Sequence, residues 1–179
     1  MSAERSTGFG TYPLRYLALG LLMKGPDHGY QLDQTLEEDF QMIWKAGQTK
    51  LYVTLSRLEE AELLGSELEP QENRPDRKVY HLTDQGRQEF LSWVRSPVPS
   101  MRAVRVELIA KLRFFNLLDL PRVEDLIHAQ QKVFQDMIQE WAEDQEGESD
   151  PFLKEVYEFR IRQASFINAW LDTYLERFA

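Results

Sequence analysis

Apolar residues recur at helical spacing in the first part of the chain. Their positions follow the i, i+3, i+4, i+7 pattern of a helix with one buried face. They belong to three expected helices: Leu14, Leu17, Ala18, Leu21 and Leu22 in the first, Leu32, Leu36 and Phe40 in the second, and Leu51, Leu55 and Leu58 in the third. Gly25 and Pro26 separate the first two, because glycine and proline interrupt helices. We predict that the second helix begins near His28 and that the third runs from about Lys50 to Leu63.

The periodicity changes after the third helix. Leu64–Leu68 and Lys78–Leu82 are short segments rich in β-formers, and they flank the turn-rich residues Gln71–Asp76. Two such segments joined by a turn predict a β-hairpin. Thr83 then offers a good N-cap for a further helix that continues through Trp93.

The segment Ser96–Ser100 is the best candidate for a linker, because its two prolines cannot continue a helix. We place a domain boundary there, with residues 1–96 as the first domain and 97–179 as the second. Beyond it the apolar spacing is helical throughout, with breaks near Pro121 and between Gly147 and Pro151. The first two stripes are Val104, Leu108, Leu112 and Phe115, and Val123, Ile127, Phe134, Met137 and Trp141.

The last predicted helix carries a stripe of large apolar side chains. Successive members are four, three, seven, four and four residues apart, a spacing typical of a coiled-coil seam. A seam of this kind is too apolar to face water, so we expect it to join two copies of the chain. Its members are Phe152, Val156, Phe159, Phe166, Trp170 and Tyr174.

Composition supports a soluble globular protein. The chain has 179 residues, of which 42% are hydrophobic and 28% charged, so it suits one domain or two small ones. It has no cysteine, which excludes disulfides, thiolate metal sites and cysteine nucleophiles. The longest apolar stretch, Leu17–Met23, is far too short to span a bilayer, and the N-terminus lacks the apolar core of a signal peptide. We expect a cytoplasmic protein.

Signatures of enzymes and cofactor sites are sparse. His28, His81 and His128 lie far apart and have no ligand-like spacing, so solvent-facing or capping histidines are the simpler interpretation. No phosphate-binding glycine loop and no nucleophile with a neighbouring base can be identified. We therefore expect neither an enzyme nor a bound metal or cofactor.

The charge is unevenly distributed. A net charge of −9 disfavours a protein that coats nucleic acid indiscriminately. Between Gln41 and Leu58, however, every charged residue is basic, and a second basic cluster lies in the expected hairpin. The first set is Lys45, Lys50 and Arg57, and the second is Arg74, Arg77 and Lys78. Two small positive patches on an acidic body suit a local contact with an anion.

The third helix has the properties of a DNA recognition helix. Its leucines define the buried side, so hydrogen-bonding groups and cations point away from it. Lysine and arginine neutralise phosphates, while threonine, serine and glutamine reach phosphates or base edges. The candidate DNA-binding residues are Gln48, Thr49, Lys50, Tyr52, Val53, Ser56 and Arg57 on the helix and Arg74, Arg77 and Lys78 on the hairpin. An ordinary surface helix with a neutral face by accident is the alternative.

Several segments of this sequence resemble PadR-family transcriptional regulators. Leu17–Leu22 together with His28–Leu32 is similar to the start of such proteins, and Leu51–Glu59 is similar to their recognition helix. Arg74–Thr83, followed by Gly86, resembles their wing. The resemblance implies a mainly α fold: a winged helix-turn-helix domain with a two-stranded wing, followed by an α-helical dimerisation domain.

The resemblance also implies a function, namely a repressor that acts as a homodimer and is released by a small ligand. Two recognition helices would enter major grooves one helical turn apart, on a pseudo-palindromic operator. Trp93, Trp141 and Trp170 are candidates for stacking on a small aromatic effector, although packing in the core or the dimer seam is the simpler explanation of these tryptophans. The alternative function is a winged-helix protein–protein interaction module that does not bind DNA directly.

Overall fold

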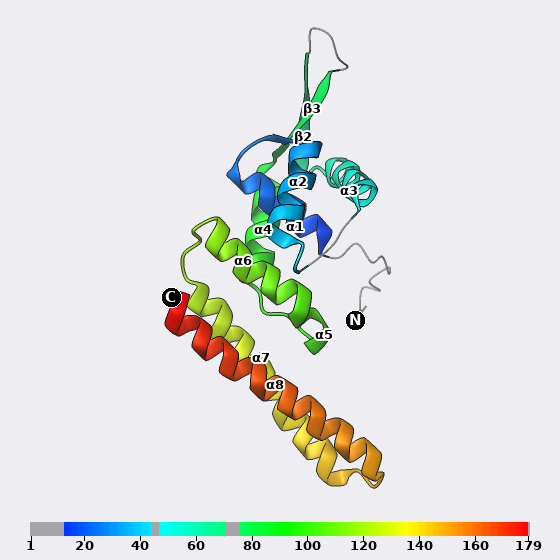
Figure 1. Cartoon of the computed structure of the whole chain (residues 1–179), viewed down its shortest axis with the longest axis vertical. Coiled ribbons are helices and arrows are strands. Elements are labelled where there is room, and N and C mark those ends of the chain that lie inside the picture. Colours follow the sequence, from blue (N-terminus) through cyan, green and yellow to red (C-terminus); the bar gives the residue numbers. More distant parts are fainter. Residues whose placement is uncertain (1–12, 44–46, 71–75, 179) are drawn as a thin grey trace. The chain divides into compact units, whose positions relative to one another are not determined.

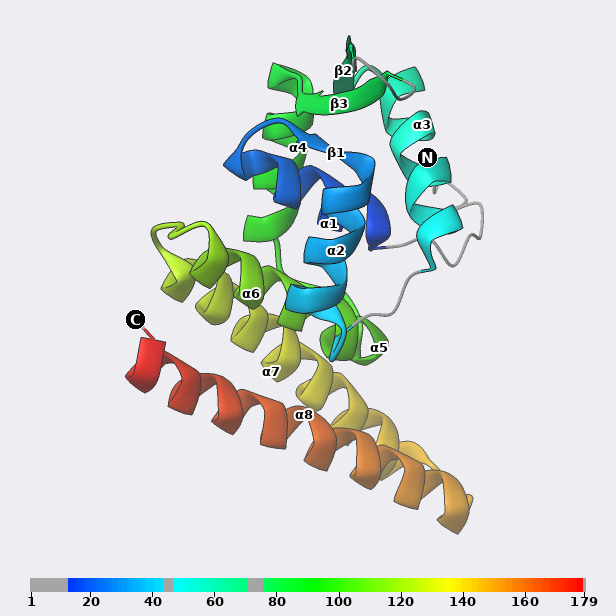
Figure 2. The same ribbon diagram turned by 45° about the horizontal axis from the view of Figure 1, so that its top comes forward.

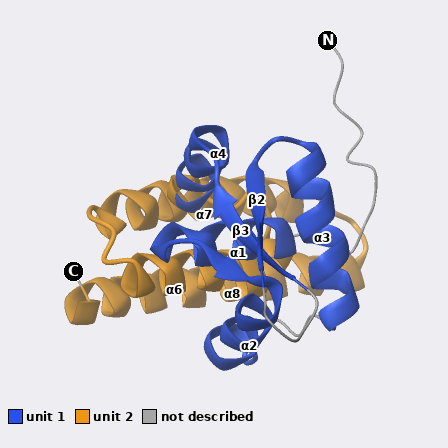
Figure 3. Ribbon diagram, turned by 90° about the horizontal axis from the view of Figure 1, so that it is seen from above, with its two compact units in different colours: residues 1–94 blue, residues 95–179 orange. Residues whose placement is uncertain are grey.

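Helices dominate the computed structural model, which describes residues 13–43, 47–70 and 76–178. The chain divides into an N-terminal unit, residues 1–94, and a C-terminal unit, residues 95–179 (Figure 3). The elements of the first are α1 (Leu14–Leu21), a 3-10 turn (Leu22–Lys24), β1 (Asp27–His28), α2 (Gly29–Phe40), α3 (Gln48–Glu60), β2 (Leu64–Glu69), β3 (Arg77–Leu82) and α4 (Asp84–Arg95). Those of the second are α5 (Met101–Ala103), a π-helical turn (Val104–Leu108), α6 (Ile109–Leu117), α7 (Val123–Gly147) and α8 (Pro151–Phe178).

The core of the N-terminal unit forms where α1, α2 and α3 pack together (Figure 2). The leucine stripes predicted from the sequence supply it, because residues three and four apart share one face of a helix. Phe90 and Val94 from α4 are also fully buried. The predicted core residues of these three helices are all buried: Leu14, Leu17, Ala18, Leu21, Leu22, Leu32, Leu36, Phe40, Leu51, Leu55 and Leu58.

The β2–β3 hairpin is confirmed as an antiparallel pair that runs from Leu64 opposite Leu82 to Glu69 opposite Arg77 (Figure 1). A third strand, β1, pairs with the other edge of β3 and gives the order β1-β3-β2. The sequence did not predict β1, because two residues are too few to show a period. Three helices followed by this hairpin form a winged helix-turn-helix fold.

The junction between the hairpin and α4 is tightly built. The Thr83 hydroxyl accepts the Gly86 N–H at 3.0 Å, which confirms Thr83 as the N-cap, and it lies within hydrogen-bonding distance of two backbone carbonyls after α3. A Cβ on Gly86 would lie 2.0 Å from the Leu63 carbonyl oxygen, so only glycine fits there. The α3 helix itself ends at Glu60, before the predicted Leu63, because Glu62 adopts a left-handed φ of 58°.

The C-terminal unit consists, in its described residues, of helices and their connections. Its two long helices, α7 and α8, lie side by side as an antiparallel pair (Figure 1). The stripe predicted for the first segment is buried at all four positions, although that segment contains a π-helical turn that sequence periodicity does not reveal. The helix α7 begins at Val123, after Arg122 in a left-handed conformation, so Pro121 lies outside its first turn.

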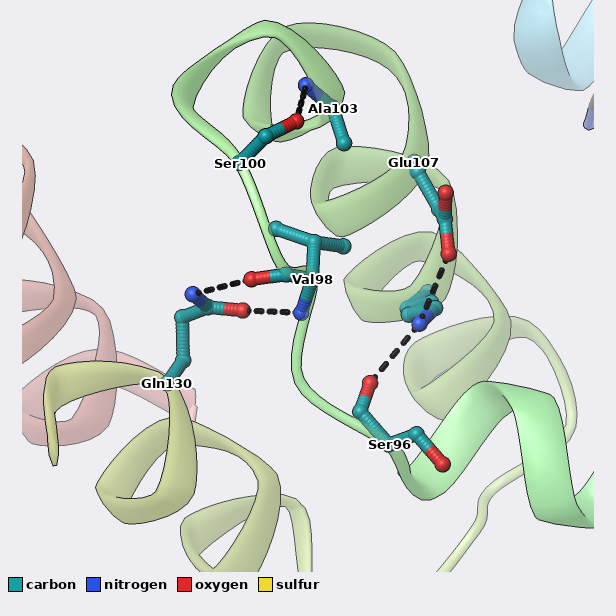
Figure 4. A network of polar contacts seen from close by, with 7 residues as sticks. Ser96, Val98, Ser100, Ala103, Glu107 and Gln130 are labelled. Carbon is teal, nitrogen blue, oxygen red and sulfur yellow. Dashed lines mark hydrogen bonds and ion pairs between the residues drawn. The ribbon is translucent and has the colours of Figure 1, made fainter. Parts of the chain in front are cut away.

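Two buried side chains hold the proline-containing segment of the C-terminal unit in place (Figure 4). The Gln130 side-chain amide donates to the Val98 carbonyl at 3.1 Å and accepts the Val98 N–H at 2.6 Å. Lys111 donates to the Ser96 carbonyl at 2.7 Å and lies 3.0 Å from the Glu107 carboxylate. Burial lowers the pKa of Lys111, and the neighbouring Glu107 opposes that effect. Residues 96–100, predicted as a linker, are therefore anchored to α6 and α7.

Replacing Gln130 should destabilise the C-terminal unit. In Gln130→Leu the Val98 N–H and carbonyl lose their partners in a buried place, and each unsatisfied group costs about 1–3 kcal/mol. We expect the free energy of unfolding to fall by about 2–6 kcal/mol in a denaturant titration. Gln135→Leu, an exposed position on the same helix, is the matched control. Equal stability of the two variants would show that the Val98 contacts contribute little.

Candidate nucleic-acid interface

One face of α3 is open to solvent and, from Gln48 to Arg57, carries no acidic side chain. Leu51, Thr54, Leu55 and Leu58 face inward, and the Thr54 hydroxyl is bonded to the Lys50 carbonyl at 2.8 Å. The predicted binding residues of this helix are all exposed: Gln48, Thr49, Lys50, Tyr52, Val53, Ser56 and Arg57. They present amide, hydroxyl, methyl and cationic groups along about two and a half helical turns. These groups suit contacts with the base edges and phosphates of a nucleic-acid groove.

The predicted residues of the hairpin have different surroundings from one another. Arg77 and Lys78 are exposed at the start of β3, while Arg74 lies outside the described residues. Lys78 Nζ is 2.6 Å from Glu59 Oε2 of α3 and 5.2 Å from the centre of the Tyr80 ring. The hydrogen bond from Lys78 to Glu59 raises the pKa of Lys78 and lowers the pKa of Glu59. The charge of Lys78 is thus already compensated within the protein.

A hollow of about 510 Å³ lies between the start of α2, α3 and β3. We call it the α2–β3 hollow. Tyr30, 63% exposed, and Gln31 border it from α2, and Tyr52 borders it from α3. A Cβ on Gly29 would lie 2.7 Å from the Tyr52 ring, so glycine lets that ring rest on the first turn of α2. Its full lining is His28, Gly29, Tyr30, Gln31, Tyr52, Arg77, Lys78 and Tyr80.

The α2–β3 hollow is rich in hydrogen-bond donors. The ordinary pKa of a phenol lies well above neutrality and burial raises that of Tyr80 further, so this side chain is a donor at neutral pH. The His28 Nε2 atom lies 3.4 Å from the Glu69 carboxylate of β2. Phenols, an amide and a guanidinium around one hollow suit an anion with several oxygens. The sequence singled out Tyr52, Arg77, Lys78 and the His28–Leu32 segment separately. It did not show that they line one hollow, because the lining comes from three segments that lie far apart in the chain.

The described residues hold no group of three or more histidine, aspartate or glutamate side chains arranged for a metal ion. Of the three histidines, His28 borders the hollow, His81 packs against Gly65 and His128 is exposed on α7. In the same described ranges no helix has the length and apolarity needed to cross a membrane.

The predicted seam of α8 divides into two sets. Phe152, Phe159 and Phe166 are 72%, 65% and 72% exposed, an unusual position for phenylalanine. Val156, Trp170 and Tyr174 are half-buried, and the Trp170 and Tyr174 rings are 5.8 Å apart. The three exposed phenylalanines are seven residues apart and form one stripe on the outer side of this helix.

The three tryptophans proposed for an effector occupy different places. Trp93, in the N-terminal unit, is buried and stacks on Tyr16 with ring centres 4.6 Å apart. Trp141 is half-buried on α7, with the Arg160 guanidinium 5.3 Å from its ring centre. Trp170 lies ten residues beyond Arg160 on α8, about 15 Å along the helix axis. The effector site stays a prediction.

Residues 18–92 match the model of the "Transcriptional regulator PadR-like family". This segment is a PadR-like domain. The chain is 30% identical over 117 residues to the negative transcriptional regulator PadR of Bacillus subtilis, a match that covers 65% of this chain and 64% of that protein. It is 29% identical over 92 residues to the probable transcriptional regulator Rv1176c of Mycobacterium tuberculosis, covering 51% and 49%. The chain thus spans 64% of the length of the first relative and 49% of the length of the second.

A solved structure of Bacillus subtilis PadR in complex with operator DNA is also similar to this chain. It is 23% identical, covers 94% of this chain and 99% of that one, and has a TM-score of 0.49. The PadR-like domain contains α3, the hairpin and the α2–β3 hollow, so the candidate interface lies within the segment that defines the family.

Proposed function

We propose that this protein is a transcriptional repressor that binds duplex DNA through its PadR-like domain. The observation that carries the proposal is the outer face of α3, where polar and basic side chains are exposed from Gln48 to Arg57 with no acidic residue among them. The family model supports it, and so does the name of the Bacillus relative, a negative transcriptional regulator. Exposed donors and cations suit binding of an anion, and we assign the surface no catalytic role.

In this proposal α3 lies in the major groove. Lys50 and Arg57 contact backbone phosphates, which positions the helix without reading sequence. Gln48, Thr49 and Ser56 are placed to bond base edges or phosphates, and the Val53 side chain is placed to contact a thymine methyl group. Sequence is therefore read by the uncharged side chains of the exposed face, and its two cations supply most of the affinity.

The α2–β3 hollow receives the DNA backbone in this arrangement. A winged helix has the recognition helix and the wing on neighbouring stretches of duplex, so a backbone strand passes between them. Tyr30, Gln31, Tyr52 and Arg77 border the hollow at that place and offer donors to phosphate oxygens. The hollow adds Tyr30 and Gln31 to the residues proposed from the sequence.

We infer a homodimer from the exposed phenylalanine stripe of α8. A soluble protein seldom leaves three such side chains open at seven-residue spacing unless another surface covers them. Two-fold pairing would present two α3 helices to half-sites about 34–36 Å apart on a pseudo-palindromic operator. A small aromatic effector that releases the operator belongs to the same proposal and rests on the tryptophans alone.

Selection of genomic DNA tests the function directly. Fragments of the source genome are bound to the purified full-length protein, washed at about 0.15 M salt and sequenced. We expect enrichment of inverted repeats whose half-site centres lie about one helical turn apart, including sites near the protein's own gene. A set of bound fragments with no shared sequence would contradict the proposal of an operator-binding repressor.

Substitutions in the middle of α3 should alter sequence preference more than affinity for unrelated DNA. In Val53→Ala and Ser56→Ala the base-facing groups change while both helix cations remain. We expect each to reduce discrimination at one operator position by about 1–3 kcal/mol and to leave the salt dependence unchanged. Competition binding against single-base operator variants measures this. Unchanged preference at every position would place base readout elsewhere.

A further inference from the structure

Three elements of the PadR-like domain meet at the carboxylate of Glu59. Glu59 is in the last turn of α3, and its side chain is 29% exposed. Its Oε1 atom accepts the Ser66 hydroxyl of β2 at 2.5 Å. Its Oε2 atom accepts the Lys78 ammonium of β3 at 2.6 Å. One side chain of the helix therefore bonds to both strands of the hairpin.

The strands present these partners on the same face of the hairpin. Ser66 lies opposite Tyr80 in the antiparallel register, so the two side chains point to one side. Lys78 is two residues before Tyr80 and shares that side, because side chains alternate along a strand. The Lys78 ammonium lies 5.2 Å from the centre of the Tyr80 ring. Glu59 thus contacts the face of the hairpin that looks toward α3.

We propose that Glu59 is a positioning residue with two effects. It fixes the wing, which is the β2–β3 hairpin, against the recognition helix α3, and it keeps Lys78 from binding DNA phosphates. The proposal rests on the proposed function, since it describes how the same surface selects its DNA. Lys78 borders the α2–β3 hollow beside Arg77, and its charge would otherwise be available there. A cation already paired with a carboxylate displaces few counterions from a phosphate, so it adds little to affinity for unrelated DNA.

The wing's share of phosphate binding then falls to Arg77 among the described residues of β3. Arg77 is exposed at the first position of the strand. A wing held at one distance from α3 favours duplexes whose backbone fits both contacts. A freed Lys78 would bind any backbone within its reach. Glu59 therefore raises the ratio of specific to unspecific binding rather than affinity itself.

The test compares Glu59→Gln with Glu60→Gln. Both substitutions remove one negative charge from neighbouring positions of α3, but Glu60 is exposed and only Glu59 holds the wing. Glutamine at position 59 keeps an oxygen for the Ser66 hydroxyl and loses the charge that binds Lys78. Lys78→Met and the double variant Glu59→Gln/Lys78→Met complete the cycle. Denaturation midpoints confirm that all four variants fold.

Affinity is measured between about 50 and 200 mM salt on a selected duplex and on an unrelated one. In Glu59→Gln we expect the slope of log affinity against log salt to steepen by about 0.9, the value for one added phosphate contact. The ratio of specific to unspecific affinity should fall. The single variants Lys78→Met and Glu60→Gln should have the same salt slope as the parent. The double variant Glu59→Gln/Lys78→Met should also have the parent's salt slope, because the freed lysine is absent.

Two results would overturn the proposal. One is an equal slope of log affinity against log salt in Glu59→Gln and Glu60→Gln. The other is a slope in Lys78→Met that is shallower than the parent's by about 0.9, the value for one lost phosphate contact. A measurement without DNA separates this inference from the function itself. NMR titration of the Lys78 ammonium should show a lower pKa in Glu59→Gln and no change in Glu60→Gln. If the parent binds no duplex, the proposed function fails, while this titration still decides whether the Glu59–Lys78 ion pair exists.

Discussion

The double substitution Phe159→Glu/Phe166→Glu is expected to convert the protein into a folded monomer that binds its operator at least a hundredfold more weakly. Both side chains are mainly exposed in the single chain, so a carboxylate costs the protomer little. In a dimer seam the same carboxylates would be buried without partners, which is strongly unfavourable. Losing the second half-site removes an effective-concentration gain of about 10²–10⁴. Sedimentation and fluorescence anisotropy with labelled operator measure the two effects.

A matched variant controls for the two added negative charges on α8. Leu153→Glu/Ser165→Glu places two carboxylates at exposed positions of α8 that lie more than a quarter of a turn away from the phenylalanine stripe. This control should remain a dimer with the parent's affinity for the operator. A stable dimer of the phenylalanine variant, at concentrations where the parent is also a dimer, would show that α8 pairs the subunits through another surface or not at all.

The double substitution Lys50→Glu/Arg77→Glu should nearly abolish binding to any duplex. These two exposed cations lie on α3 and at the start of β3, and each is proposed to contact a phosphate. Charged hydrogen bonds contribute about 1.5–3 kcal/mol each, and the new carboxylates repel the backbone besides. We expect a loss of at least a hundredfold at 0.1 M salt. At salt concentrations where binding can still be measured, the slope of log affinity against log salt should be shallower by about 1.8, the value for two lost phosphate contacts.

Net charge must be matched in the comparison. Arg102→Glu/Lys154→Glu makes the same change in charge at exposed positions of the C-terminal unit. Its long-range field is screened over about 8–10 Å at these salt concentrations, so binding should weaken only slightly. If the two double variants weaken binding equally, the protein's overall field governs the interaction and α3 is not its contact surface.

Helical periodicity explains why much of the fold was predictable. Leu51, Leu55 and Leu58 repeat at the spacing of one buried helix face, and that spacing also defined which side chains of α3 face solvent. The hairpin was predictable because β-forming segments flank a turn-rich run. The strand β1 was not, since its two residues gain their conformation by pairing with Val79 and Tyr80.

Contacts between distant residues could not be predicted in the same way. Lys78 carries a charge in the sequence, but its pairing with Glu59, nineteen residues earlier, depends on where the hairpin folds back. The α2–β3 hollow likewise joins side chains from β1, α2, α3 and β3. On α8, spacing predicted an apolar stripe, but only the fold shows that Trp170 and Tyr174 are half-buried while Phe152, Phe159 and Phe166 are exposed.

The most direct test of the account is to map the DNA contact on the protein by NMR. Backbone amide signals of the full-length protein are followed as a duplex from the genomic selection is added. The account predicts that the largest changes fall on residues 48–57 of α3, 29–31 of α2 and 77–80 of β3. Changes confined to α7 and α8, with these three segments unaffected, would contradict it.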